Sequence, residues 1–471
     1  MTGSFRKLAL SSLLLALPGC VLAPRDFAAE KERAAAAGAP YQRPFEERAL
    51  PELPENPTWR DVLQRAFLAS GDLEAAYFEW KAALERVNIA AGYPNTNVSI
   101  GYEYLFSPGN MKAWDRTTLS VGFDPMQNLS FPTKVLAAGR VALDDARAAG
   151  KRFEAAKFDL QRRVLTAYVD YALTAERIRI HHGHAHLLRL AAESARTRVH
   201  TGAMQQEVLA ADVAHELGDD EVKRMEAELP RMRAMLNALM ARPADAPLPA
   251  PAALPEPRPV AADAELLAVA VANNPELAEL AAQAAGRADA VELARQQYFP
   301  DINPFAGFTG SAEQAVGAMV TLSTTIPQIR ASIREAQAMQ RATQAMLRQR
   351  AADRGAEFAA ALVALRDAER RERLFRDRIA PLAELAVRST RSSYTTGGGR
   401  LAEMLEAEGT LLDAQLMFAE ARADREKRVA ELEALAGVDM EALAADAKQS
   451  DPHPPAPLSQ RTGEGGEENA L

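Results

Sequence analysis

Four of the chain's seven histidines fall within six residues, inside a segment with the apolar spacing of one long helix. They are His181, His182, His184 and His186. His182 and His186 are four residues apart, so a helix places their imidazoles on one face at the spacing of a metal-binding pair. No carboxylate or cysteine ligand is fixed beside them, and a solvated helix face is the simpler interpretation. We therefore predict no metal site and keep His182 and His186 as the metal-ligand candidates.

Cys20 is the single cysteine among 471 residues. It follows a short basic stretch and an apolar run over residues 8–17, which is too short to span a bilayer. This pattern is typical of a signal peptide over residues 1–19. Leu17-Pro18-Gly19-Cys20 is similar to a bacterial lipobox, and a buried structural thiol is the alternative. We expect Cys20 to carry a covalent N-terminal lipid and expect no other cofactor.

The run Gly397-Gly398-Gly399-Arg400 has the glycine content of a phosphate-binding loop. No strand precedes it and no lysine of such a loop follows, so we predict a turn between two helices. Glu403 and Glu406 come next, three residues apart, and share one face of the following helix. From their type and spacing alone they are two solvated glutamates on an exposed helix face. No catalytic constellation stands out, and we predict that the protein is not an enzyme.

Composition restricts the class of protein. The 64 carboxylates outnumber the 55 Lys and Arg residues, which argues against a nucleic-acid partner. Alanine and charged residues are abundant and aromatic residues make up only 6%, as in proteins built of long helices. No run of 18 apolar residues follows Cys20, so we expect no transmembrane helix.

The chain contains two copies of one unit. Pro132 and Pro327, which we expect to open two long helices, are 195 residues apart. Other residues recur at the same offset: Leu187, Leu190, Ala191, Ser194, Arg196, Thr201 and Gly202 recur as Leu382, Leu385, Ala386, Ser389, Arg391, Thr396 and Gly397. We predict a first repeat over 56–242 and a second over 263–440, separated by a Pro/Ala-rich extended linker at 243–262.

The ends of the chain differ from the repeats. We expect residues 20–55 to be a lipid-anchored, extended N-terminal segment. From residue 441 to 471 the Pro, Gly and Glu content predicts a disordered tail.

Each repeat has two segments that alternate between apolar and other residues, which predicts strands with one apolar face. The predicted strands cover about 97–106 and 116–124 in the first repeat and about 302–310 and 316–326 in the second. Lengths of about nine to eleven residues are those of membrane-spanning β-strands. A small soluble sheet packed on helices is the alternative.

Very long helices follow the strands. The 71 residues from Pro132 to Gly202 contain no internal proline and predict roughly 100 Å of helix. The second copy runs from Pro327 to Gly397, and we expect it to be kinked or loosened at Pro381. Each long helix should end in a tip turn, at Gly202 and at Gly397, and return as a second helix.

Four strands cannot close a barrel, and an open edge cannot stand in lipid because its amide groups stay unpaired. If the strands enter the membrane, several chains must therefore pool them, and three chains give twelve. We predict a mainly α fold with a small antiparallel β part and a duplicated helix-strand-strand-helix repeat. The trimer would form a twelve-stranded β-barrel continued by a long periplasmic α-helical barrel.

The repeats resemble the TolC-like outer-membrane efflux protein family across nearly the whole mature chain. Asn274-Pro275-Glu276-Leu277 and Phe299-Pro300-Asp301 are similar to the opening of the family's second repeat. Ser393-Tyr394-Thr395-Thr396-Gly397 and the helix after it are similar to the periplasmic tip. Phe131-Pro132-Thr133-Lys134 is similar to members associated with heavy-metal pumps.

The resemblance implies a homotrimeric lipoprotein of the cell outer membrane that spans much of the periplasm. It implies docking to a periplasmic adaptor (membrane fusion) protein, which links the duct to an inner-membrane pump. The function implied is the exit duct of a tripartite efflux or type I secretion system, with passive export of small molecules or metal ions. A periplasmic coiled-coil structural or adaptor lipoprotein without a membrane barrel is the alternative, and the paired strands argue against it.

The resemblance also assigns roles at the tip. Tyr394 and Arg400 match a tyrosine and an arginine whose contacts help to hold the family's tunnel closed. Glu403 and Glu406 match its two tunnel-lining carboxylates, and Glu207 is the counterpart in the first repeat. These five residues are therefore the tunnel-constriction candidates.

Overall fold

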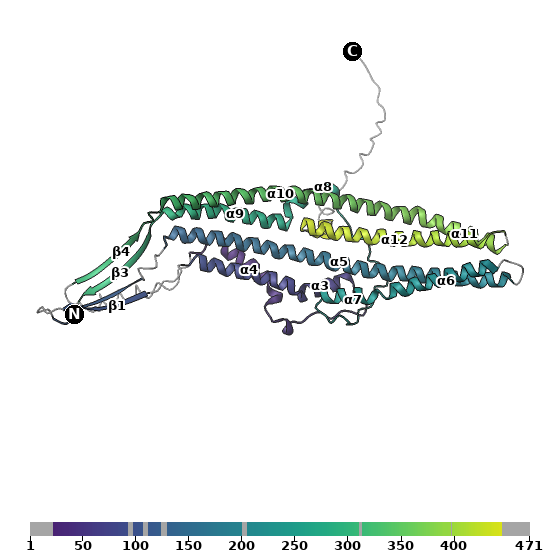
Figure 1. The fold of residues 1–471 in the computed structure, drawn as a ribbon, viewed down its shortest axis with the longest axis horizontal. Coiled ribbons are helices and arrows are strands. Elements are labelled where there is room, and N and C mark those ends of the chain that lie inside the picture. The colour runs from purple at the N-terminus through teal and green to yellow at the C-terminus, as the bar shows by residue number, and fades with distance from the viewer. Residues whose placement is uncertain are drawn as a thin grey trace, which may run out of the picture.

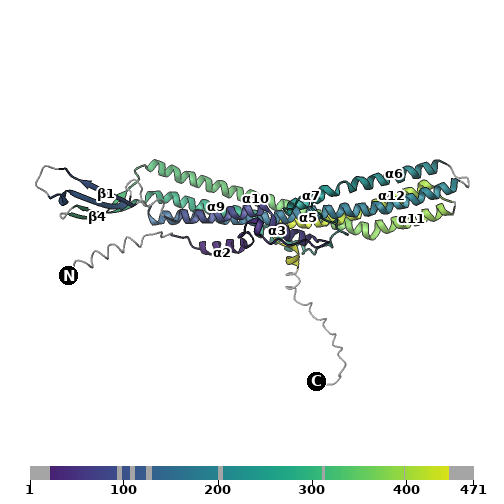
Figure 2. The same ribbon diagram turned by 90° about the horizontal axis from the view of Figure 1, so that it is seen from below.

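The computed structural model describes residues 22–92, 98–106, 112–123, 130–199, 205–309, 313–396 and 398–444. The molecule is long and narrow, with a sheet at one end and two helical hairpin tips at the other (Figure 1). Shorter helices surround the middle of the long ones (Figure 2). Among the described residues no helix has both the length and the apolar character needed to cross a membrane.

The sheet has four antiparallel strands in the order β1-β2-β3-β4. They are β1 (Val98–Tyr104), β2 (Thr117–Phe123), β3 (Asp301–Thr309) and β4 (Glu313–Thr321). The first three agree with the expected strands within two residues at each end. β4 begins three residues before the expected start and ends five residues before the expected end at 326. The chain leaves the sheet early because Pro327 opens the next helix, and the hydroxyls of Ser323 and Thr325 lie 3.0 Å apart in the connection.

Pro304 lies inside β3, where a proline removes one donor from the ladder of hydrogen bonds. The pairing of β3 with β2 begins only at Phe305, next to this proline. The pairing with β4 continues through Pro304, which is opposite Ala318. Pro304 therefore lies just outside the pairing with β2, where its missing N–H removes no hydrogen bond between β2 and β3.

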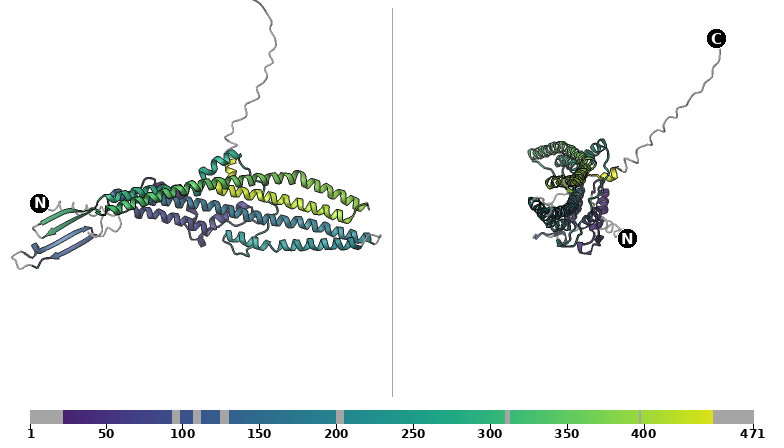
Figure 3. Two further views of the ribbon diagram at one scale, coloured as in Figure 1. Left: turned by 45° about the horizontal axis from the view of Figure 1, so that its top comes forward. Right: turned by 90° about the vertical axis from the view of Figure 1, so that its right-hand side faces the viewer.

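The sheet has one apolar face and one polar face, because cross-strand partners share a face and neighbours along a strand alternate. Exposed apolar residues occupy one face on both hairpins: Ile100, Tyr102, Leu119, Val316 and Val320. The opposite face carries Thr118 and Thr309, whose hydroxyls lie 3.2 Å apart. In the described part of the chain no helix packs substantially on either face. The sheet extends beyond the helices rather than lying on them (Figure 3).

The longest helix is α5 (Pro132–Val199), whose 68 residues span about 100 Å. Its counterpart is divided into α10 (Ile326–Leu374), a π-helical turn (Phe375–Ile379) and α11 (Ala380–Thr395). Pro381 cannot donate a backbone hydrogen bond, and the wider π turn comes just before it. The expected loosening at Pro381 is therefore confirmed.

The helices form an open, curved layer when viewed end-on (Figure 3). Near the sheet the order is α4 (Gly71–Ala90), α5, α9 (Pro275–Arg295) and α10. Near the tip it is α6 (Gln205–Glu226), α5, α12 (Leu401–Ala436) and α11. One lateral edge is thus formed by β1, α4 and α6, and the other by β4, α10 and α11. Within the described chain no further strand or long helix flanks either edge.

The N-terminal segment is not extended, contrary to the expectation for residues 20–55. It contains α2 (Phe27–Ala37) and short 3₁₀ turns. This segment folds because it has a core to pack on: Phe27 and Tyr41 are buried with residues of α4 and α5. Trp80 of α4 donates a 3.1 Å hydrogen bond to the buried Glu30.

The remaining short helices lie around the middle: α3 (Trp59–Ala69), α7 (Leu229–Leu239) and α8 (Asp263–Asn273). Residues 243–262 contain neither helix nor strand and run across the long helices. Residues 441–444, which the sequence assigned to the tail, are helical, and Ala444 is buried.

A buried ion cluster fixes the 243–262 segment to α12. Arg258 lies 2.9 Å from Glu426 and 2.9 Å from Glu433, and all three side chains are at most 6% exposed. Arg425 donates a hydrogen bond to the backbone oxygen of Arg258 at 2.7 Å. The Arg258 guanidinium also lies over the ring of Trp59, 5.4 Å from its centre. The cluster therefore joins three segments that are far apart in the sequence.

Candidate constriction at the helix tip

The tip is held together by a small core of alanines around one aromatic ring. Tyr394 of α11 is 2% exposed and packs with Leu401 and Met404 of α12. Ala191, Ala192 and Ala195 of α5 and Ala211 of α6 complete this core. Small side chains allow the four helices to approach closely. The structure thus places the predicted constriction residue Tyr394 inside one chain and not on its surface.

Arg400 and Glu403 form a pair at the start of α12. Arg400 Nε donates a 2.9 Å hydrogen bond to Glu403 Oε1, and the two side chains are 79% and 49% exposed. This hydrogen bond lowers the pKa of Glu403 below its ordinary value. Glu403 is therefore ionised near neutral pH, and its charge is partly offset by its own chain.

Glu406 lies one turn further along α12 and is exposed. Glu408, two residues on, is buried and points to a different side, because two residues rotate a helix by about 200°. The buried side of α12 borders a hollow of about 500 Å³, whose lining includes His184, Leu254 and Glu408. Glu403 and Glu406 are not part of that lining. The two predicted constriction carboxylates therefore share a face that is open to solvent in the single chain.

Two ion pairs at the tip were missed in the sequence. Arg196 of α5 lies 2.8 Å from Asp212 of α6, and Arg391 of α11 lies 2.6 Å from Glu408 of α12. Each arginine ties an outgoing helix to the helix that returns. The signal was present, because Arg196 and Arg391 recur at the repeat offset of 195 residues. Their partners follow 16 and 17 residues later, a separation that becomes informative only once the hairpin is known.

Glu207 does not join the other candidates. It is half-buried on α6, and its Oε2 is buried without a hydrogen-bond partner among the described residues. No hydrogen bond or ion pair within the described chain connects it to Arg400, Glu403 or Glu406. Cys20 and the tip-turn residues Gly202 and Gly397 lie outside the described residues.

The histidine cluster does not converge on one point. His182 lies 3.3 Å from Glu226 of α6, whereas His186 lies 2.8 Å from Arg189. Burial lowers the pKa of His181 and of His184, which makes both neutral near pH 7. Across the part of the chain that the structure describes, no three His, Cys, Asp or Glu residues are placed to hold a metal ion.

The fold matches solved outer-membrane channels. VceC from Vibrio cholerae superimposes with a TM-score of 0.66 at 18% identity, covering 81% of this chain and 97% of that one. The open state of MtrE from Neisseria gonorrhoeae gives 0.64 at 18% identity, with 81% and 89% coverage. CmeC from Campylobacter jejuni gives 0.64 at 12% identity, with 83% and 88% coverage. These likenesses show a shared fold.

The fold is therefore that of the TolC-like outer-membrane channels. Residues 266–438, from α8 to the end of α12, match the family model described as outer membrane efflux protein. The resemblance predicted from the sequence is thereby confirmed. No curated protein matches the chain by sequence.

Proposed function

We propose that the chain is one subunit of a trimeric exit duct in the outer membrane, serving a tripartite efflux or type I secretion system. The observation that carries this proposal is the sheet, which exposes a continuous apolar face and leaves both edge strands, β1 and β4, unpaired in the described chain. An apolar face without a covering layer suits lipid, and unpaired edges require other strands there.

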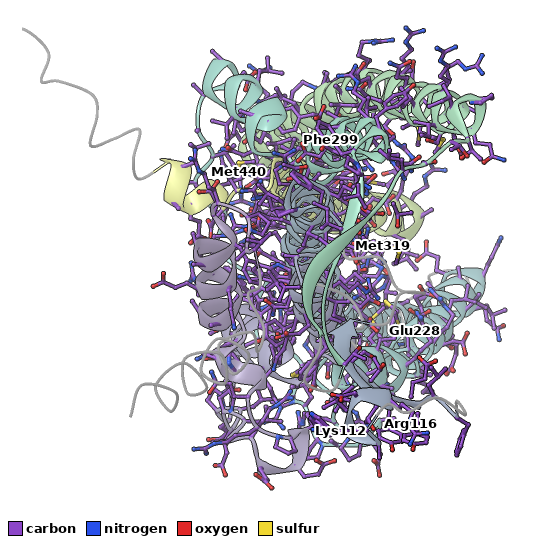
Figure 4. The ribbon with its side chains drawn as sticks, turned by 90° about the vertical axis from the view of Figure 1, so that its left-hand side faces the viewer. Lys112, Arg116, Glu228, Phe299, Met319 and Met440 are labelled. Carbon is purple, nitrogen blue, oxygen red and sulfur yellow. The ribbon has the colours of Figure 1, made fainter. Side chains whose placement is uncertain are left out.

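Aromatic residues at both ends of the sheet support insertion in a bilayer. At the helix end, Tyr298 and Phe299 are 45% and 48% exposed, and Phe299 stacks with Phe131 at 6.1 Å between ring centres. At the other end, Trp114 and Phe106 are exposed. Figure 4 views the molecule from the sheet end, with Phe299 and Met319 labelled. Such girdles mark the two interfaces of membrane β-barrels.

The two lateral edges of the helical layer are complementary in charge, which supports a ring of identical copies. On one edge, α6 has seven carboxylates against two basic residues. On the other edge near the tip, the stretch from Phe375 to Thr395 has four arginines against two carboxylates. Contacts between unlike edges of identical chains form a ring when the rotation closes. Three copies would pool twelve strands.

Exposed apolar residues lie on the same two edges near the tip. Leu209, Val213 and Leu217 follow one another at four-residue intervals on α6, each 59–66% exposed. Leu382 and Leu385 of α11 are 63% and 54% exposed. These stripes would be covered when α6 of one copy meets α11 of the next.

Within such a ring, Glu403 and Glu406 of three copies would line the narrow end of a helical tunnel and favour cations there. The tip would dock a periplasmic adaptor that connects the duct to an inner-membrane pump, and export through the duct would be passive. Cys20 would anchor each chain to the outer membrane by its lipid. Cys20→Ser should then abolish incorporation of a radioactive fatty acid. Equal labelling of the unchanged protein and of Cys20→Ser would contradict the proposed lipid anchor.

Mass and conductance together test the proposal. The full mature chain, purified in detergent, should have three times the mass of one chain by light scattering. In planar bilayers it should form water-filled channels. A stable monomer without detergent would contradict the barrel and favour the alternative, a periplasmic coiled-coil lipoprotein.

A further inference from the structure

A row of arginines follows one side of α10 just below the sheet. Arg330, Arg334, Arg341 and Arg348 fall within an arc of about 40° at 100° per residue, and all four are exposed. Within the described chain none of them has a carboxylate oxygen within 4 Å of its guanidinium. Glu335 is the only carboxylate among residues 326–352. This stretch therefore has five arginines against one carboxylate and is strongly positive.

The equivalent stretch of α5 is different. Lys134 lies 2.7 Å from Asp301, and Arg140 lies 3.5 Å from Asp289. Arg147 contacts both Asp144 and Asp26. Near the sheet, the basic residues of α5, inside the layer, are therefore paired with carboxylates. Those of α10, at the edge of the layer, have no carboxylate partner in the described chain. Arg334 Nε donates a 3.3 Å hydrogen bond to the backbone oxygen of Arg330. The other N–H groups of these guanidiniums remain available to an external anion.

The upper end of the row lies at the boundary of the apolar sheet. Leu322, just after β4, is 65% exposed, and α10 begins four residues later at Ile326. Arg330 and Arg334 are about one and two turns further along, roughly 6 and 12 Å from the start of the helix. With Pro327 and Ile333 they border an open hollow of about 530 Å³. Two cationic groups therefore stand beside an apolar surface at the depth where headgroups lie if the sheet spans the bilayer.

We propose that Arg330 and Arg334 bind the phosphate of an anionic phospholipid in the periplasmic leaflet. This inference rests on the proposed barrel, because only an inserted sheet brings lipid to this level. Guanidinium groups form two parallel hydrogen bonds to a phosphate and keep their charge in low-dielectric surroundings. Pro327 and Ile333 would contact the apolar part of the same lipid. Anionic lipid thus supplies the charge that the chain itself does not.

The matched test compares two double variants that remove equal charge from the same helix. R330Q/R334Q changes the upper pair, whereas R348Q/R350Q changes two exposed arginines about 25 Å further down. The full-length protein in detergent is titrated with phosphatidylglycerol and, separately, with phosphatidylcholine. Native mass spectrometry counts the lipids retained by the intact assembly. A third titration uses inorganic phosphate alone.

The unchanged protein should retain phosphatidylglycerol in preference to phosphatidylcholine. R330Q/R334Q should weaken that retention roughly tenfold, and R348Q/R350Q should change it less than about twofold. R330K/R334K should restore part of it, since charge returns without the paired hydrogen bonds. If both glutamine variants lost phosphatidylglycerol retention equally, the effect would come from the general positive charge of the helix and not from a site at Arg330 and Arg334. That result would overturn the proposal.

Other outcomes separate the alternatives. Displacement of the lipid by millimolar inorganic phosphate would overturn the proposal in favour of a site for the free ion. Dissociation of the R330Q/R334Q assembly would assign the arginines to carboxylates of the neighbouring copy, and would also overturn it. If the intact assembly retains both lipids equally, the lipid site is contradicted and the proposed barrel is not. Failure of the unchanged protein to bind detergent or either lipid contradicts the barrel as well.

Discussion

The middle of the molecule and its tip contain the same charged groups but hold them in opposite ways. In the middle, Arg258, Glu426 and Glu433 are at most 6% exposed and share several hydrogen bonds. At the tip, Arg400 and Glu403 form one pair that is mostly exposed. Buried ions are costly to separate, whereas exposed pairs contribute little to stability. The middle is therefore built to stay in one arrangement, and the tip keeps its charges accessible.

Removal of one member of the buried cluster should give the largest effect. Arg258→Met leaves Glu426 and Glu433 buried without their main partner, so we expect a loss of about 3–5 kcal/mol in the unfolding free energy. Arg60→Met is the matched control, because its pair with Glu441 is exposed on the arginine side and should contribute less than about 1 kcal/mol. Urea unfolding followed by circular dichroism measures both. Similar losses in the two variants would contradict the contrast between middle and surface.

The two equivalent ion pairs at the tip should differ in strength. Arg391→Met leaves Glu408, whose side chain is 4% exposed, and we expect a loss of about 2–3 kcal/mol. Arg196→Met leaves Asp212, which is 33% exposed, and the loss should be below about 1 kcal/mol. The same unfolding experiment compares them. A larger loss for Arg196→Met than for Arg391→Met would show that burial of the carboxylate does not determine how much each ion pair contributes to stability.

The exposed tip carboxylates should affect conduction and not stability. Glu403→Ala with Glu406→Ala should leave the assembly and its unfolding unchanged, because both side chains are exposed. Cation selectivity and block by trivalent cations from the periplasmic side should fall several-fold, since screening is weak in a narrow lumen. Single-channel recordings in planar bilayers measure both. Asp367→Ala with Glu384→Ala removes equal charge elsewhere and should have no such effect.

An intact Glu403→Ala/Glu406→Ala trimer with unchanged selectivity would place both glutamates on the outside of the tube. The assignment of the lumen face of α12 would then be wrong. The buried cluster in the middle would be unaffected by that result.

The smallest expected effect is a dependence on pH at His184, between the tip and the middle. Burial lowers its pKa, and Glu408 and Asp413 oppose that shift in part. The unfolded chain therefore binds a proton that the folded chain resists, so stability should fall as the pH decreases below about 6.5. His184→Gln should flatten this decline between about pH 6.5 and 5. A thermal unfolding series over that range provides the measurement, and an unchanged slope would contradict it.

The sequence predicted regular elements well because each has a local pattern. Alternation located the first three strands within two residues, and the lack of internal proline located α5. Pro381 indicated the loosened turn because its missing N–H acts on its own helix. The end of β4 was misjudged, since the apolar run at Leu322 continues beyond the last paired residue.

Features that depend on distant partners could not be predicted in this way. Arg258 is 168 and 175 residues from its two glutamates, and nothing near it in the sequence marks it as buried. The helix α2 lies in a segment whose core partners are on α4 and α5, so its composition alone suggested an extended chain. The two tip ion pairs could be predicted from the sequence only in part. Repetition identified their arginines, and only the hairpin geometry identified their partners.

The π-helical turn from Phe375 to Ile379 divides the second long helix into an upper shaft and a lower arm. The arm, α11, has 16 residues and is therefore about 24 Å long. A change of only about 10° at the turn displaces the far end of such an arm by about 4 Å, more than the width of a water molecule. The uninterrupted α5 has no equivalent pivot. A small bend at this turn therefore moves the tip of the α11–α12 hairpin, whereas the α5–α6 hairpin has no such turn. An opening lined by both hairpins can then widen or narrow by movement of the α11–α12 hairpin alone.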